Sequence, residues 1–89
     1  MEIVFQIHDA SISDRMKKRA EEALMKAARR AARPQDAVIR FQQDGRVRRV
    51  EMTLHTAGGR RFVASSDAPY FGSALSGAAR KLAMLLPLP

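Results

Sequence analysis

The sequence has no cysteine, no tryptophan and few acidic residues, and it has no long apolar stretch. Without cysteine the chain can form neither a disulfide nor a thiolate metal site, which suits a reducing compartment. A helix that crosses a membrane needs about 20 consecutive apolar residues, and no segment approaches that length. The first residues also lack the layout of a signal peptide. We therefore expect a cytoplasmic protein with no membrane partner.

Motifs for catalysis are also missing. There is no glycine-rich phosphate loop, no nucleophile elbow and no pair of carboxylates at a plausible site. The two histidines, His8 and His55, stand near the ends of expected strands without a third ligand for a metal. The sequence therefore predicts a protein that is not an enzyme. We expect no catalytic residue, no metal, no cofactor and no small-molecule substrate.

The charge is the strongest feature of the composition. The 89 residues are 46% hydrophobic, which predicts one folded domain over residues 1–89 with a modest core. Sixteen lysines and arginines against nine acids give a net charge of +7 and a pI near 11.1. This balance predicts an anionic partner, with nucleic acid as the first candidate. A basic surface that merely maintains solubility is the alternative, but the charges are clustered.

The clustered lysines and arginines lie in a predicted helix over residues 13–33. Ser13 is a suitable N-cap, Asp14 favours the first turn, and Pro34 is expected to end the helix. At about 100° per residue, the small and apolar side chains fall on one side: these are Met16, Ala20, Ala23, Leu24, Ala27 and Ala31. The opposite side gathers cations: Arg15, Lys18, Arg19, Lys26, Arg29, Arg30 and Arg33.

We predict that this basic side binds RNA. An ordinary solvated helix face is the alternative interpretation. Only Glu21 and Glu22 are available to neutralise the cations between Arg15 and Arg33, so most of the positive charge is uncompensated.

Alternation of apolar and polar residues predicts four strands. They are Glu2–His8, 37–42, Val47–Thr56 and 60–65, with Asp44-Gly45 and Gly58-Gly59 as turns. The inward residues are expected to be Ala37, Ile39 and Phe41, then Val50, Met52 and Leu54, with Thr53 among the outward ones. A second helix is predicted after a cap at Ser66 or Asp67, with Pro69 in its first turn. Its apolar face is Phe71, Leu75, Ala78, Leu82 and Leu85, and Pro87 and Pro89 end it.

The predicted order is β-α-β-β-β-α. A strand–helix–strand start favours a right-handed crossover, so the first two strands should be parallel. Tight hairpins make the remaining pairs antiparallel. Because alternating strands have one solvated face, both helices should pack on the same face of a four-stranded sheet. The fold class is α+β, and the basic side of the first helix faces solvent.

Two runs of residues resemble a known family. Met52-Thr53-Leu54-His55-Thr56-Ala57-Gly58-Gly59, followed by Phe62-Val63-Ala64-Ser65, is similar to the third and fourth strands of the bacterial hibernation-promoting factor family. That family includes the ribosome-associated inhibitor proteins and was once described as modulators of sigma-54. Ser73-Ala74-Leu75, with Arg80-Lys81-Leu82 and Leu86, resembles its second helix.

The resemblance implies a function. It implies binding to the small ribosomal subunit, in the channel where messenger and transfer RNA lie, with both helices on ribosomal RNA and translation blocked in quiet cells. The family's basic positions correspond to Lys17, Lys26, Arg29 and Lys81, and Arg80 is the other second-helix candidate. Tyr70-Phe71-Gly72 replaces the family's acidic-x-Tyr pattern, and Leu85–Pro89 stands where the family usually has a basic tail.

Several alternatives stay open at this point. The chain could be a generic binder of structured RNA, or a protein-interaction module. Such a module would use the apolar residues 85–89 and an outer side of the second helix formed by Ser73, Ser76, Gly77, Ala83 and Met84. The arginines at the turns, which are Arg46, Arg48, Arg49, Arg60 and Arg61, could bind phosphates or protect strand edges. Tyr70 could stack on bases. The sequence does not determine the oligomeric state.

Overall fold

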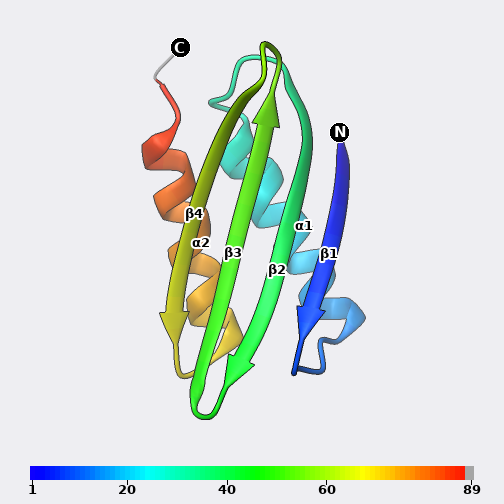
Figure 1. Ribbon diagram of the computed structural model, residues 1–89, viewed down its shortest axis with the longest axis vertical. Helices are drawn as coiled ribbons and strands as arrows, with labels where there is room; N and C mark the ends of the chain where they lie inside the picture. Colours follow the sequence, from blue (N-terminus) through cyan, green and yellow to red (C-terminus); the bar gives the residue numbers. More distant parts are fainter. Residues whose placement is uncertain (88–89) are drawn as a thin grey trace.

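Six elements follow one another in the predicted order. In the computed structural model, which describes residues 1–87, they are β1 (Glu2–His8), α1 (Asp14–Ala28), β2 (Pro34–Asp44), β3 (Val47–Thr56), β4 (Arg60–Ala68) and α2 (Phe71–Leu85). The strands form one sheet in the order β1-β2-β3-β4, with β1 parallel to β2 and the other neighbours antiparallel. Figure 1 shows both helices behind this sheet. The predicted α+β fold is confirmed.

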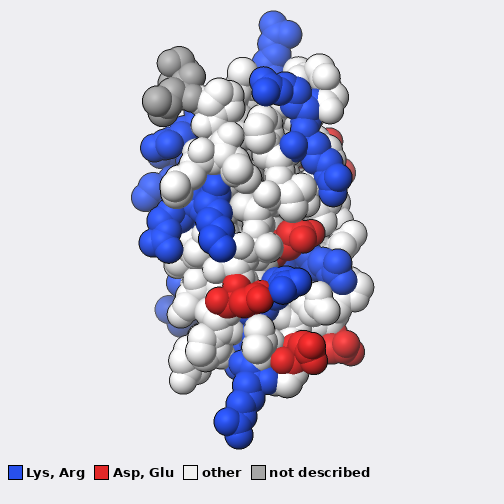
Figure 2. Space-filling view, turned by 60° about the vertical axis from the view of Figure 1, so that its left-hand side comes forward, with Lys and Arg blue, Asp and Glu red and all other residues white. Residues whose placement is uncertain are grey.

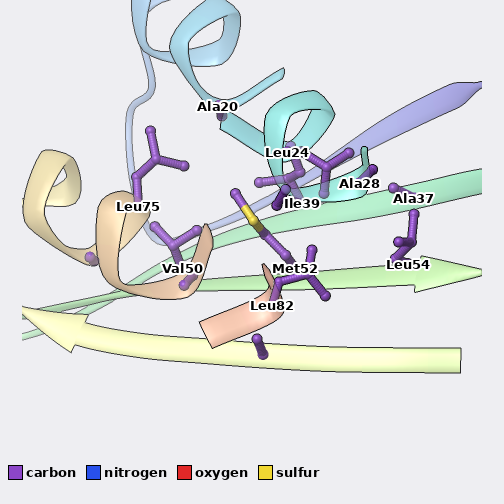
Figure 3. Packing of buried hydrophobic residues seen from close by; sticks show 14 of the residues in the cluster. Ala20, Leu24, Ala28, Ala37, Ile39, Val50, Met52, Leu54, Leu75 and Leu82 are labelled. Atoms are coloured by element: carbon purple, nitrogen blue, oxygen red, sulfur yellow. The ribbon is translucent and has the colours of Figure 1, made fainter. Parts of the chain in front are cut away.

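The core fills the space between the sheet and the two helices. Cross-strand neighbours such as Phe5, Ile39, Met52 and Ala64 lie in one row on the inner face of the sheet. Leu24 from α1 and Leu82 from α2 reach the same layer (Figure 3). The largest fully buried side chains are Phe41, Leu24, Ile39, Met52, Leu54, Leu82 and Val50. The predicted inward residues of β2 and β3 are therefore confirmed.

The outer face of the sheet is less exposed to solvent than the alternation of apolar and polar residues predicts. Thr53 was expected to point outward, and it does lie on that face, but it is only 8% exposed. Its direct neighbours in the sheet are Val38 on β2 and Val63 on β4. These two β-branched side chains stand beside the threonine, as cross-strand neighbours about 5 Å apart do, and remove it from water.

The β2–β3 hairpin has the predicted glycine turn. Asp44 pairs with Val47, and Gly45 between them has a φ of +61°. Arg46 is not among the residues with positive φ, so only the first central position is left-handed, as in a type II′ turn. Gly58 and Gly59 have φ values of +85° and +75° in the β3–β4 turn. Both turns join adjacent antiparallel strands and thereby fix their register.

The first helix is shorter than predicted. It ends at Ala28 rather than Arg33, and Pro34 is the first residue of β2. The reason is the crossover: β2 must start level with β1, because Asp36 pairs with Glu2. Seven residues of strand and fifteen of helix have nearly the same length, about 22 Å each. A longer helix would overshoot the sheet, so the chain returns to it through residues 29–33.

The second helix begins later than predicted. Ser66 and Asp67 belong to β4, and Tyr70 is the N-cap residue, without a side-chain hydrogen bond to the helix. Its end also differs from the prediction, because Leu85 is 51% exposed whereas Leu86 is 3% exposed. Leu86 has left the helical path with a ψ of 137°, which turns its side chain into the core. Pro89 and Leu88 lie outside the described residues.

Gly77 is placed differently from the prediction as well. It was assigned to the outer side of the second helix, but it is buried. A Cβ atom on Gly77 would lie 2.9 Å from the Cβ of Ser66, and closer still to its Oγ. The absence of a side chain therefore lets α2 approach β4 closely. Gly77 belongs to the packing between α2 and the sheet and is not available to a partner protein.

Candidate RNA-binding face

The orientation of α1 follows from its N-terminal cap and from the side chains that it buries. The Ser13 hydroxyl accepts a hydrogen bond from the Met16 amide at 3.1 Å, as predicted for the N-cap. Asp14 stands in the first turn. Ala20, Leu24, Ala27 and Ala28 are buried against the sheet and α2. The cations on the opposite side are consequently directed into solvent.

The net charge of the protein is concentrated on the helices. The helix layer, which we define as residues 11–33 and 71–87, has ten lysines and arginines against three acids. The remaining residues, mainly the sheet, have six of each. In Figure 2 the left edge, on the helix side, shows blue side chains with no red among them, whereas blue and red side chains occur together towards the sheet at the right. The excess of +7 therefore belongs to the helix layer.

Six cations of the first helix and its extension lie on one exposed side. We call these residues, together with Arg80 of α2, the basic helix face. The six are Arg15, Lys18, Arg19, Lys26, Arg29 and Arg30, all exposed. Arg29 and Arg30 lie just beyond the last residue of α1, in the turn that continues from it.

A groove between α1 and α2 interrupts this face. It has a volume of about 370 Å³ and is lined by Ala23, Lys26, Ala27, Arg30, Ser76, Ala79, Arg80 and Ala83. Most of the lining residues are alanine or serine, so the sides of the groove are low. The cations of its lining come from both helices and from the turn after α1. Arg30 crosses the groove, because its guanidinium donates a hydrogen bond of 3.4 Å to the carbonyl of Ala83. The groove is thus bordered by Lys26, Arg30 and Arg80.

The cations of the basic helix face have no partner of opposite charge within residues 1–87. The close contacts between acidic and basic side chains in this part of the chain are the ion pair of Arg49 with Asp67 and the contact of His55 with Asp36, both on the sheet. The hydrogen bond from Arg49 lowers the pKa of the exposed Asp67 carboxyl below its ordinary value. Asp67 and Asp36 therefore contact sheet residues, and the helix charges remain available to an anion.

Two of the residues predicted to bind RNA, Lys17 and Lys81, lie outside the basic helix face. Lys17 is partly buried, and it is nine residues from Lys26, which places it roughly 180° around the helix. Lys81 is exposed, but its ammonium donates a hydrogen bond of 3.0 Å to the carbonyl of Ser65, on the β4 side of α2. Neither side chain lies beside the groove. Sequence spacing alone separates Lys17 from the others, whereas the position of Lys81 depends on the packing of α2.

Arg33 was predicted on the helix ridge, and this prediction is wrong. Its backbone has a φ of +52°, and its carbonyl accepts a hydrogen bond from Ala57 at 3.0 Å. The residue is the point at which the chain turns from the helix layer into β2. There it lines a second cavity of about 310 Å³ at the end of the molecule, and Arg60 and Phe62 line the same cavity. The sequence did not predict that Arg33 and Arg60 line the same cavity, because no local pattern indicates where the chain crosses from the helix layer to the sheet.

Two other kinds of site are absent from the described part of the chain. Residues 1–87 contain no group of three or more His, Cys, Asp and Glu residues arranged to hold a metal ion. No helix among them is long and apolar enough to cross a membrane. The nitrogen Nδ1 of His55 lies 2.7 Å from a carboxylate oxygen of Asp36, on the outer face of the sheet. The basic helix face is the candidate functional site because its cations are exposed and have no ion pair among residues 1–87.

Comparison with known proteins agrees with the fold and the resemblance. Residues 3–86 match the family described as sigma 54 modulation protein / S30EA ribosomal protein. The chain belongs to this family. Membership confirms the resemblance to the hibernation factors and identifies a ribosome-associated modulation factor, and the family is not a known family of enzymes. A comparison with curated protein sequences finds no match.

Two solved structures have the fold of this family member. A ribosomal subunit interface protein from Coxiella burnetii superimposes with a TM-score of 0.85 at 16% identity, over 97% of this chain and 93% of that one. The N-terminal domain of Protein Y from Thermus thermophilus gives a TM-score of 0.82 at 19% identity, over 97% and 96% of the two chains. At these identities the likeness establishes the fold.

Proposed function

We propose that this family member is a hibernation factor that inhibits translation by binding ribosomal RNA of the small subunit through the basic helix face. Residues 1–89 act as one ribosome-binding domain in the cytoplasm. The observation that supports this proposal is the separation of charge. The helix layer has ten cations against three acids, while the rest of the chain is balanced. Family membership supports the ribosome as the partner.

The geometry suits a phosphate backbone. Cations from both helices line the α1–α2 groove, so a strand of RNA that follows it meets Lys26 and Arg80 on opposite sides and Arg30, which reaches across to the carbonyl of Ala83. Arginine binds phosphate oxygens through two parallel hydrogen bonds, which adds orientation to attraction. Since none of these cations has an ion pair among residues 1–87, no internal pair must be broken when RNA binds.

Reversing two of these charges tests the proposal. We expect Lys26→Glu/Arg29→Glu to bind purified small subunits much more weakly than the parent. The log–log slope of affinity against salt should fall by about 0.7 to 0.9 for each phosphate that the variant no longer neutralises. Both residues are exposed, so the melting temperature should stay nearly unchanged. Arg60→Glu/Arg61→Glu is the matched control, because it makes the same charge change at the β3–β4 turn, outside the groove.

Sedimentation through sucrose gradients identifies the partner. Co-migration of the parent with small subunits or whole ribosomes, together with inhibition of cell-free translation, agrees with the proposal. Equal binding to unrelated structured RNA would indicate a generic RNA binder instead. Migration with a protein partner alone would indicate an interaction module. If the Lys26/Arg29 variant co-sediments like the parent in moderate salt, the basic helix face is not the binding surface.

A further inference from the structure

Tyr70 occupies a position in which it does not stabilise the fold. It is the N-cap residue of α2, and its side chain makes no capping hydrogen bond. Serine, threonine, aspartate or asparagine at such a position stabilises a helix by about 1 kcal/mol relative to a residue that cannot cap. The ring is also not part of the core, since Tyr70 is 71% exposed. Tyr70 therefore presents an exposed ring where the helix favours a capping side chain, and departures of this kind from local preference are found at functional sites.

Two arginines from other elements cover the residues on either side of this ring. Arg48 of β3 donates a hydrogen bond to the carbonyl of Pro69, and its guanidinium carbon lies 5.9 Å from the centre of the Phe71 ring. Arg19 of α1 lies over Gly72, where a Cβ atom would be 3.6 Å from one guanidinium nitrogen. Figure 1 shows the start of α2 at the same end of the molecule as the β2–β3 hairpin. Two other elements therefore place guanidinium groups against Pro69, Phe71 and Gly72, the residues that flank Tyr70 in the chain.

The charge of these two arginines is not neutralised within residues 1–87. Asp67 is the acid nearest to Tyr70 in the sequence, and it is bound to Arg49 by hydrogen bonds of 2.6 and 3.0 Å. Neither Arg19 nor Arg48 forms an ion pair in this part of the chain. An anion that approaches Tyr70 therefore meets two available guanidinium groups. An exposed aromatic ring whose chain neighbours contact two such groups matches a nucleotide, which has a flat base and charged phosphates on both sides.

We propose that Tyr70 is a stacking platform for an unpaired nucleobase, and that Arg19 and Arg48 bind the phosphates next to that base. The inference rests on the proposed function, and it deepens it by specifying the class of RNA at this end of the molecule. Bases of a duplex are stacked and paired, so only a single strand, loop or bulge can present a base to the ring. Base–aromatic stacking tolerates any base, because every base has a π-face.

The composition allows a direct test. The chain has one tyrosine and no tryptophan, so its tyrosine fluorescence reports on Tyr70 alone. We expect an eight-nucleotide single-stranded oligouridylate to quench this emission as it binds, and a blunt RNA duplex of equal charge to bind without quenching. Equal quenching by both, or binding of the single strand without quenching, overturns the proposal.

Affinity for small subunits separates this inference from the proposed function. Loss of one stacked base weakens binding by about 5- to 150-fold, so Tyr70→Leu should weaken binding by that factor, whereas Tyr70→Phe should bind like the parent. The melting temperature should be the same for both, because the ring is exposed. If Tyr70→Leu binds small subunits as the parent does, the stacking role is refuted and the basic helix face is unaffected. If the parent itself does not bind ribosomes, both proposals are refuted.

Discussion

We expect Gly77→Ala to destabilise the protein, although alanine is the better helix former. Gly77 lies in the middle of α2 and faces β4. The new Cβ atom would lie 2.9 Å from the Cβ of Ser66, closer than such atoms approach in real proteins. Rotation of the Ser66 hydroxyl relieves its own contact with the new methyl group, but the Ser66 Cβ is fixed by the strand. Either α2 or β4 must therefore move.

The magnitude follows from two opposing effects. An extra methyl group in a packed interior costs about 1 to 3 kcal/mol, and a contact with a fixed atom at this distance belongs to the upper half of that range. Alanine instead of glycine in a helix interior offsets about 1 kcal/mol of this cost. The free energy of unfolding should consequently fall by about 1 to 2 kcal/mol.

Urea denaturation followed by far-ultraviolet circular dichroism measures this change. Gly72→Ala is the matched control in the same helix, since its Cβ would meet only the Arg19 guanidinium at ordinary contact distances of 3.6 and 3.8 Å. It should not destabilise. Ser66→Gly should restore part of the stability in the Gly77→Ala background, because it removes both atoms that the new methyl group meets. A Gly77→Ala protein as stable as the parent would show that α2 does not contact β4 at this position.

Two further predictions concern the core and the ion pair on the sheet. Leu82→Ala should lower the free energy of unfolding by about 2 to 5 kcal/mol, because Leu82 is fully buried between α2 and the sheet. Leu85→Ala should lower it much less, since Leu85 is half exposed. Equal effects of the two substitutions in urea denaturation would contradict the placement of Leu82 in the core. Asp67→Asn should reduce stability slightly at neutral pH. The pKa of Asp67 is lowered in the folded state by the Arg49 hydrogen bond, so this contribution is present above the ordinary carboxyl pKa and disappears as the pH falls through the lowered value. Melting temperatures of the two proteins should therefore converge in acid, and a difference that persists there would exclude the pair as its cause.

Much of this fold could be predicted from local patterns. The bounds of β1 and β3, the glycine at Gly45 and the cap at Ser13 were all correct. Each of them depends on residues close together in the chain: the alternation of a strand, the left-handed backbone that glycine permits, or a hydroxyl three residues from an amide. The cationic side of α1 was found in the same way, since helical periodicity alone separates it from the buried alanines.

Other features were decided only when the elements packed together. Residues 29–32 have good helix-forming composition, yet α1 stops at Ala28 because the crossover to a parallel β2 must match the length of β1. The same requirement separates Arg33 from the helix and places it in the lining of the cavity that Arg60 also lines. Leu86 replaces Leu85 in the core, and Gly77 faces β4, because the tilt of α2 on the sheet is set by contacts between distant residues. Periodicity determines which side of a helix is apolar, whereas the length of the helix and the neighbours of each side chain depend on the partner element across the core.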